Sequence, residues 1–189
     1  MRHEATGALI IDEELMLDPT GPEQLEELLA IFEAEVEEII SAMPWIVTDQ
    51  PLRQQVVPFL MDMQFYGQRG TMHNWVVRQR ATSELIGMIG LDDSTHAIGA
   101  DWNLGYWVRR SARGRAVATR MIDTVITLAR DLDCLGLELK VDPTNEAGVA
   151  TVQSALRRWG GGRAEEGDRK FQMKDGMVLH NSYLLSLRG

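Results

Sequence analysis

The sequence contains a single cysteine, Cys134, among its 189 residues. An internal disulfide and a metal site built from several cysteines are therefore excluded. The surrounding segment, Asp-Leu-Asp-Cys-Leu-Gly-Leu, supplies carboxylates and apolar side chains rather than the positive neighbours that activate a thiol. We accordingly expect Cys134 to be a structural residue at the start of a buried strand.

Long hydrophobic runs and a secretion signal are also missing. No window approaches about 18 consecutive apolar residues, the length that suggests a membrane span. The N-terminal segment has neither a long apolar run nor a small-residue cleavage site. The sequence therefore predicts a cytoplasmic protein without a membrane partner. Because 44% of the residues are hydrophobic, residues 1–189 are predicted to form a single globular domain with one core.

Negative charge is in excess, but it is distributed unevenly. The net charge is −9, yet residues 1–50 alone contain 13 acids and one base, whereas residues 51–189 contain 15 acids and 18 bases. The acids of the first part form either a solvated helix face or a negative field that attracts a protonated amine, and they argue against nucleic acid on that face. Five arginines without an intervening acid occur later: Arg109, Arg110, Arg113, Arg115 and Arg120.

Hydrophobic spacing and turn residues predict an alternation of strands and helices along the chain. Metal ligation is not indicated, because His73 and His96 have no partner at the spacing of metal ligands. Strands are expected at 8–17, 75–80, 85–91, 102–108, 135–141, 170–172 and 177–187. Helices are expected at 23–40, as one long or two short helices, and at 52–66, 116–132 and 148–159.

The segment Arg-Gly-Arg-Ala-Val-Ala at 113–118 lies where a predicted strand ends and a helix begins. Residues 114, 116 and 118 have at most one side-chain carbon, so an anion can approach the backbone. Successive N–H groups at a helix start bind phosphate oxygens, and the helix dipole favours negative charge there. Arg113 and Arg115 can add charge-assisted hydrogen bonds. Alone, the same pattern also fits an ordinary helix start, so its meaning depends on context.

The context resembles a known family. Gly-Tyr-Trp-Val at 105–108 precedes the Arg-Gly-x-[Gly/Ala]-x-Ala-Thr pattern at 113–119, and a predicted strand then leads to Asn-Glu-Ala at 145–147. This order is similar to that of the GNAT acetyltransferases, in particular the RimJ/RimL-type branch. Met-Pro-Trp at 43–45 matches a phrase common in that branch. The resemblance extends from about residue 9 to 187, and its specific part is 104–160.

The resemblance implies an α/β (α+β) GNAT fold. In this fold a mixed, mostly antiparallel seven-stranded sheet is flanked by helices and splays between its fourth and fifth strands, here 102–108 and 135–141. Acetyl-CoA, a cosubstrate that requires no metal, lies in the gap with its pyrophosphate on the turn and its pantetheine arm along the fourth strand. The implied coenzyme-binding residues are Trp107, Val108, Arg113, Gly114, Arg115, Ala116, Val117, Ala118, Thr119 and Asn145.

Several positions depart from the family pattern. Ala116 stands where the family usually has glycine, which is tolerable only if this residue has a negative φ. Arg110 replaces a frequent proline and Arg120 a frequent glutamate. Asn145 lies 15 residues before Gly160, about one helical turn more than the usual spacing. The transfer of its role is therefore less secure than that of the turn.

The implied reaction is direct attack of a neutral amine on the thioester, and it needs a route for the proton of the amine. Family members often have glutamate at the position of Asn103, whose amide cannot act as a base. Asp101, Glu138 or a water chain ending at an N-terminal carboxylate could take the proton instead. Tyr106 could protonate the leaving thiolate, and Ser154 and Tyr183 are alternatives. The candidate catalytic residues are Asn103, Asp101 and Tyr106.

The sequence thus predicts an acetyl-CoA-dependent N-acetyltransferase that acts on a primary amine. A peptide or protein N-terminus is favoured, because an α-amine with a pKa near 8 is roughly 10% neutral at pH 7, whereas a lysine amine is below about 0.1% neutral. A small-molecule amine is the alternative acceptor. A non-catalytic acyl-CoA-binding module and a structural domain with a fortuitous glycine turn remain the rival hypotheses. The protein is expected to be a monomer or a homodimer.

Overall fold

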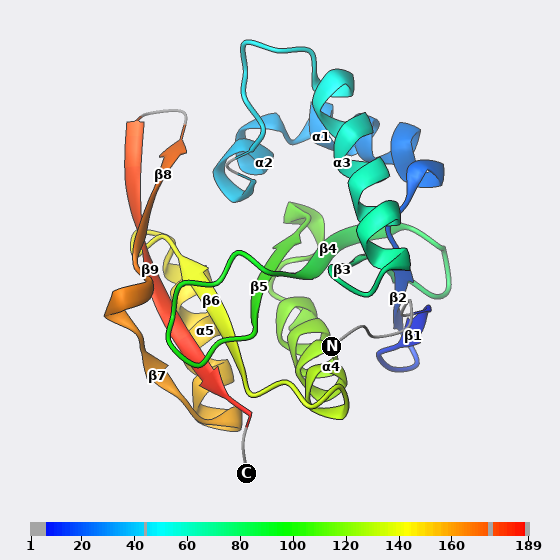
Figure 1. The fold of residues 1–189 in the computed structure, drawn as a ribbon. Helices are drawn as coiled ribbons and strands as arrows, with labels where there is room; N and C mark the ends of the chain where they lie inside the picture. The colour runs from blue at the N-terminus through cyan, green and yellow to red at the C-terminus, as the bar shows by residue number, and fades with distance from the viewer. Residues whose placement is uncertain (1–6, 44, 174–175, 188–189) are drawn as a thin grey trace.

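The computed structural model describes residues 7–43, 45–173 and 176–187. Pro44, the middle residue of the Met-Pro-Trp phrase, lies outside them. Within these residues one twisted sheet separates two groups of helices, with α1, α2 and α3 on one side and α4 and α5 on the other (Figure 1). No helix in these ranges is long and apolar enough to cross a membrane.

The N-terminal half contains five strands and three α-helices. β4 is buried along nearly its whole length, and β3 has three consecutive buried apolar residues, Trp75, Val76 and Val77, so both faces of these strands are covered. The predicted hairpin at 75–91 is confirmed as β3 and β4. The elements are β1 (Leu9–Ile10), β2 (Leu15–Pro19), α1 (Leu25–Ala34), α2 (Val36–Ala42), α3 (Leu52–Gln68), β3 (His73–Gln79), β4 (Leu85–Asp92) and β5 (Trp102–Val108).

The C-terminal half contains the predicted strand, helix and strand unit and ends in a long hairpin. Apolar side chains of α4 recur at helical spacing and are buried against the sheet, which confirms the helix expected at 116–132. The elements are α4 (Val117–Asp131), β6 (Gly136–Val141), α5 (Glu146–Trp159), β7 (Gly162–Arg163), β8 (Arg169–Met173) and β9 (Gly176–Ser186).

One predicted strand is divided in the structure, and the helical segment at 23–40 takes the second of its two predicted forms. The strand expected at 8–17 is a hairpin of β1 and β2, because the Asp12 carboxylate accepts hydrogen bonds from the N–H groups of Glu14 and Leu15 at 2.8 and 2.9 Å and stabilises a turn. The helix expected at 23–40 is two short helices, since Glu35 has a non-helical φ of −120° and ψ of 32°. The two-residue strand β7 was not predicted.

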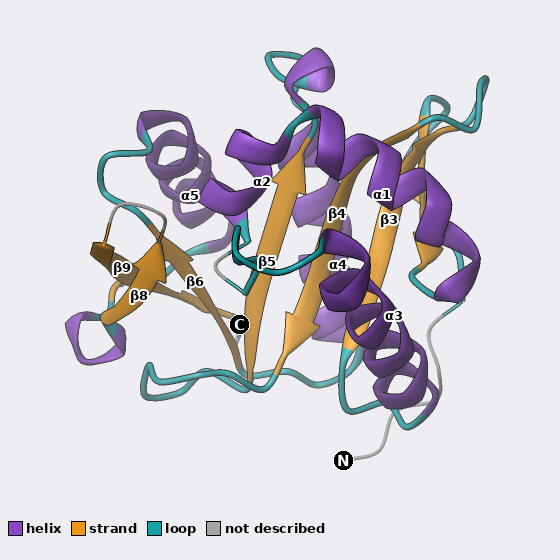
Figure 2. Ribbon diagram, turned by 90° about the horizontal axis from the view of Figure 1, so that it is seen from above, coloured by secondary structure: helices purple, strands orange, loops and turns teal. Residues whose placement is uncertain are grey.

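The strand order is β1-β2-β3-β4-β5-β6-β9-β7, and β8 pairs with β9. Seven strands have five or more residues, and all their pairings except that of β5 with β6 are antiparallel. β5 and β6 pair only where they begin, at Trp102 with Leu137 and Asn103 with Glu138. Beyond Asn103 the two strands diverge, so the predicted splay is confirmed (Figure 2).

Two hydrophobic cores hold the helices to the sheet. The larger core lies under α4 and α5, and the smaller one joins α1, α2 and α3 to β3, β4 and β5. Trp107 of β5 belongs to the smaller core and meets Phe32 edge to face, with 6.0 Å between the ring centroids. Cys134 is buried in the larger core, and burial raises its pKa to about 12, which confirms the prediction of a structural thiol.

Ion pairs provide a second connection between the N-terminal helices and the end of β5. Glu35, at the junction of α1 and α2, accepts hydrogen bonds from Arg109 Nε and from the Arg110 backbone N–H, both at 3.2 Å. Glu38 of α2 pairs with Arg113. Glu35 and Glu38 therefore hold α2 beside the predicted phosphate turn. The acidic segment was predicted to be a solvated face or a source of negative field, and this structural role was not predicted.

Removal of the Glu35 carboxylate tests this connection. Glu35→Ala is expected to lower the free energy of unfolding by about 1.5–3 kcal/mol, because hydrogen bonds to a charged and largely buried acceptor are lost. Urea denaturation measures the change. Glu33→Ala, on the exposed side of α1, is the matched control and should change stability by less than about 0.5 kcal/mol. Equal effects of the two substitutions would contradict the connection.

Candidate functional site

The turn after β5 leads directly into α4. The Arg109 N–H donates to the carbonyl of Ile86 at 2.9 Å, and a short 3-10 helix at Arg110–Ala112 follows. Ala112 is buried in the larger core and anchors the turn. Gly114 has a φ of +74°, a conformation that glycine adopts at low cost. The predicted phosphate turn is therefore a defined backbone structure between strand and helix.

Ala116 is left-handed, with a φ of +56° and a ψ of 20°. The expectation that alanine is tolerated here because its φ is negative is wrong. A left-handed alanine costs roughly 1–2 kcal/mol, because its Cβ approaches the following carbonyl oxygen. The turn thus keeps a backbone suited to glycine while carrying an alanine, and the rest of the fold compensates for the strain.

The N-terminus of α4 is uncapped. Ala116 provides no side-chain cap, and no acidic residue lies in the first turn. Val117, Ala118 and Thr119 precede the first intrahelical hydrogen bond, which the Arg120 N–H makes to the Ala116 carbonyl at 3.0 Å. These N–H groups and the helix dipole favour an anion at this point. A Cβ built on Gly114 meets no atom within 4 Å, so space for such an anion exists.

The arginines near the turn differ in their availability. Arg113 pairs with Glu38, and its Nε donates to the Val108 carbonyl at 3.0 Å. Arg115 is exposed and makes no ion pair with any residue that the structure describes. Of the two arginines expected to bind phosphate, Arg115 is free to do so, whereas Arg113 must first exchange its partners.

Two of the remaining three arginines of the cluster, Arg109 and Arg120, are held by acids of the N-terminal half. Arg109 pairs with Glu35 and Glu84, and Arg120 pairs with Asp12 and Glu14. Their charges are therefore largely neutralised within the fold. Arg110 is largely exposed, and its contact with Glu38 is 4.0 Å long, so the positive field inferred from the sequence is reduced to the surroundings of Arg110 and Arg115.

The splay between β5 and β6 opens toward the turn. Tyr106 of β5 packs against the larger core and extends toward Thr151 of α5. Burial raises the pKa of Tyr106, and the Thr151 hydrogen bond opposes this rise in part, so the hydroxyl is protonated at neutral pH. β5 has no partner on its β6 side from Leu104 to Val108. Backbone groups of Trp107 and Val108 therefore lie on an unpaired edge, where an extended chain can add as a strand does.

Asn145 begins α5, at the end of β6. Its side-chain oxygen accepts a hydrogen bond from the Gly148 N–H at 2.9 Å, as a helix N-cap does. The N-termini of α4 and α5 thus follow the carboxyl ends of the two diverging strands. Asn145 is exposed at this end, and its amide N–H groups are open to a ligand, whereas its side-chain oxygen already accepts one hydrogen bond from α5.

Asp101 lies at the opposite end of β5. Its carboxylate accepts a hydrogen bond from the Leu135 N–H, and its own N–H donates to the Gly136 carbonyl at 2.9 Å. Asp101 is seven residues from Val108, or about 23 Å along an extended strand. The structure therefore uses Asp101 to join the starts of β5 and β6, away from the turn.

A polar cluster surrounds Asn103 where the splay begins. Asn103 bonds to Asp92 at 3.1 Å and to Lys140 Nζ at 3.4 Å, and Lys140 bonds to Glu138 at 3.0 Å. Ser182 of β9 donates to Glu138. No local pattern in the sequence indicates Asp92, Lys140 or Ser182, because their proximity to Asn103 arises from strand register rather than from spacing along the chain.

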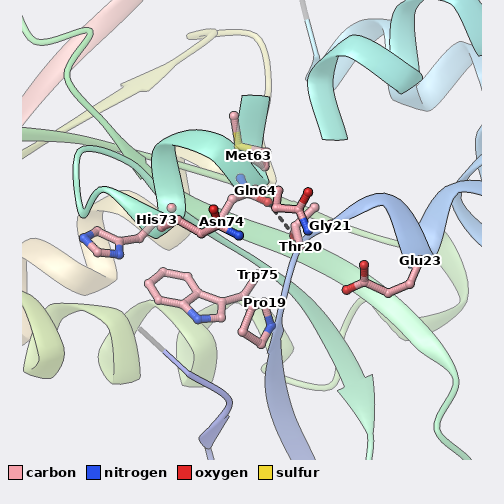
Figure 3. A pocket seen from close by; sticks show the side chains of 11 residues that line it. Pro19, Thr20, Gly21, Glu23, Met63, Gln64, His73, Asn74 and Trp75 are labelled. Carbon is pink, nitrogen blue, oxygen red and sulfur yellow. Dashed lines mark hydrogen bonds between the residues drawn. The ribbon is translucent and has the colours of Figure 1, made fainter. Parts of the chain in front are cut away.

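A shallow pocket lies elsewhere, between the end of α3 and β3, and Figure 3 shows its lining. Thr20 and Asn74 form a hydrogen bond of 2.9 Å there. His73 lines the pocket and stacks on Trp75 with 5.9 Å between the ring centroids. None of the predicted coenzyme or catalytic residues lines this pocket. In the described ranges no three His, Cys, Asp or Glu side chains are grouped as metal ligands.

Known proteins share this architecture. Residues 14–155 match the family model of the acetyltransferase (GNAT) domain. An acetyl transferase from Salmonella typhimurium, which modifies the N-terminal serine of 50S ribosomal subunit protein L7/L12, is 16% identical, with a TM-score of 0.76 over 96% of this chain and 99% of its own. No curated protein sequence matches the chain.

Two further solved structures show the same fold. The microcin C7 self-immunity acetyltransferase, solved with acetyl-CoA and AMP, is 18% identical, with a TM-score of 0.75 over 97% of this chain and 98% of its own. The ribosomal-protein-S5-alanine acetyltransferase from Vibrio fischeri is 14% identical, with a TM-score of 0.72 over 98% and 96%. At these identities the likeness establishes the fold alone.

The left-handed alanine of the turn gives a prediction about stability. Ala116→Gly is expected to raise the free energy of unfolding by about 0.5–1 kcal/mol, because relief of the Cβ strain exceeds the entropy that glycine adds to the unfolded chain. Ala116→Val should lower it by at least about 1 kcal/mol, since a β-branched residue resists positive φ. Thermal and urea unfolding measure both. A loss of stability in Ala116→Gly would show that the residue is not left-handed in solution.

Proposed function

The chain belongs to the GNAT acetyltransferase family, and from this premise we propose that it transfers an acetyl group from acetyl-CoA to a primary amine, with a peptide or protein N-terminus preferred. The observation that carries the proposal is the uncapped start of α4 at the mouth of the splay. An anion site beside an unpaired strand edge fits a cosubstrate that has a pyrophosphate at one end and an extended amide arm at the other.

Each part of the coenzyme has a complementary surface in this proposal. The pyrophosphate binds to the N–H groups of Val117, Ala118 and Thr119, and Arg115 supplies a positive charge. The pantetheine arm runs along the free edge of β5 and forms backbone hydrogen bonds near Trp107. Its thioester then points down the splay toward Asn103.

The chemistry requires an amine nucleophile and protonation of the thiolate. The neutral amine attacks the thioester carbon, and the carbon–sulfur bond of the tetrahedral intermediate then breaks. Tyr106 donates a proton to the thiolate, because its raised pKa keeps the hydroxyl protonated and β5, which carries it, borders the splay. An α-amine is the favoured acceptor, because a larger fraction of it is neutral at pH 7 than of a lysine amine.

Two observations support an N-terminal acceptor. Two of the solved relatives are described as acting on ribosomal proteins, one at an N-terminal serine and the other as an S5-alanine acetyltransferase. In addition, α2 of this chain lies beside the turn at the mouth of the splay and carries an exposed carboxylate, that of Glu37. A negative field at this position attracts a protonated N-terminus.

The direct test measures thiol release from acetyl-CoA with short peptides that begin with serine or alanine. We expect turnover with free N-termini and none with the same peptides blocked at the N-terminus. Calorimetric titration with acetyl-CoA is expected to show binding in the absence of peptide. No binding at millimolar acetyl-CoA would refute the function, and binding without turnover on any amine would support the non-catalytic alternative.

The turn itself can be tested at Gly114. Gly114→Glu is expected to weaken coenzyme A binding at least about 30-fold, because a carboxylate is placed where the pyrophosphate approaches the helix N-terminus. Gly114→Asn is the matched control, since asparagine tolerates a positive φ and adds no charge. It should bind within about threefold of the wild type. Equal affinity of Gly114→Glu and the wild type would disprove the assigned turn.

A further inference from the structure

A row of polar side chains crosses four strands of the sheet at the floor of the splay. Successive strands contribute one or two members each, and hydrogen bonds link all of them. The row lies on the face opposite α4 and α5, because the alternate residues of the same strands pack into the larger core. Its members are Asp92 of β4, Asn103 of β5, Glu138 and Lys140 of β6, and Ser182 of β9.

Glu138 is not available to accept a proton in this row. Burial alone would raise its pKa, but hydrogen bonds from the Ser182 hydroxyl, the His96 N–H and Lys140 outweigh burial and hold the pKa below its usual value. Its side chain is fully buried, and both oxygens accept hydrogen bonds. Glu138 therefore serves as the permanent counter-charge of Lys140.

Lys140 and Asp92 determine the orientation of the Asn103 amide. Lys140 Nζ lies 3.4 Å from Asn103 Oδ1, and Asn103 Nδ2 donates to Asp92 Oδ2 at 3.1 Å. The reverse orientation would place an NH₂ group against an ammonium and an oxygen against a carboxylate. Lys140 also donates to the Ser94 carbonyl at 2.8 Å and to Glu138 at 3.0 Å, so its three donors are used.

Asp92 is the member of the row that has spare capacity. Its Oδ1 accepts from the Ser94 N–H at 2.9 Å and its Oδ2 accepts from Asn103. A carboxylate has about four acceptor sites, so further hydrogen bonds can form. The residue is half-buried rather than enclosed, and it stands directly opposite Asn103 in the antiparallel pair of β4 and β5. Asn103 makes the last pairing before β5 and β6 diverge.

We propose that Asp92 is the proton acceptor of the transfer reaction and that Asn103 is its positioning residue. This inference rests on the proposed function, because it takes the thioester to point at Asn103. The amine nitrogen forms its bond to the carbonyl carbon, and one proton of that nitrogen passes to the Asp92 carboxylate through a bridging water. The carbon–sulfur bond breaks, and the thiolate takes a proton from Tyr106. Asp92 returns its proton to solvent, and Tyr106 recovers one from solvent.

The test removes the carboxylate from position 92 on β4 and then introduces one at position 103 on β5. In Asp92→Asn, kcat for an N-terminal peptide is expected to fall at least about 100-fold, while KM for acetyl-CoA changes less than about twofold. In the double variant Asp92→Asn with Asn103→Glu, residue 103 carries the proton-accepting carboxylate and residue 92 carries the amide that positions it. This exchange should recover at least about tenfold of the lost kcat. A purely structural role of Asp92 would not produce such a recovery.

Asp93→Asn is the matched control, because Asp93 is the next residue and is exposed. It should leave kcat within about twofold of the wild type. Full activity of Asp92→Asn, or a double variant no more active than Asp92→Asn, would overturn the proposal while leaving the proposed function intact. Absence of turnover in the wild type and in Asn103→Glu alone would overturn the proposed function and this inference together.

Discussion

The structure depends on where two parallel strands stop pairing. β5 and β6 share hydrogen bonds only as far as Asn103 and Glu138, and the edge of β5 beyond Asn103 is free. An unpaired strand edge inside a sheet is unfavourable unless another partner completes it. The same divergence places the start of α4 at the mouth of the gap and a polar row at its floor. In the proposed function, one interruption of the sheet thereby creates a site for the phosphates, the arm and the acyl group of the coenzyme.

Charge pairing joins this site to the N-terminal helices. Glu35 and Glu38 form ion pairs with Arg109 and Arg113. These pairs hold α2 beside the turn that precedes the uncapped N-terminus of α4. The pair of Glu38 with Arg113 is partly exposed and contributes little to stability by itself, whereas Glu35 and Arg109 are largely buried. Both ion pairs fix the position of α2 and reduce the positive electrostatic field around the turn. In the proposed function, a coenzyme phosphate that draws Arg113 away from Glu38 would leave an unpaired negative charge on α2, where it can attract the protonated amine of the acceptor.

Local patterns in the sequence predicted much of the fold. The strand at 102–108 and the helix after it follow from short-range periodicity and were located within one residue. The β1–β2 turn, β7 and the left-handed Ala116 were missed, because each depends on backbone conformation that neighbouring packing imposes. The ion pairs of the turn join residues about 75 positions apart, and no local signal reports them. Asp92 belongs to the same class, since only strand register brings it to Asn103.

The asparagine at 103 can be understood from the charges around it. Asp92 and Glu138 already place two carboxylates against one ammonium, that of Lys140. A glutamate at 103 would add a third carboxylate within one strand spacing, and like charges at this distance raise the cost of ionising each of them. Asparagine instead donates to Asp92 and accepts from Lys140, so it satisfies both neighbours without charge. The carboxylate that the position lacks is present on the adjacent strand, at the end of the hydrogen bond that asparagine makes.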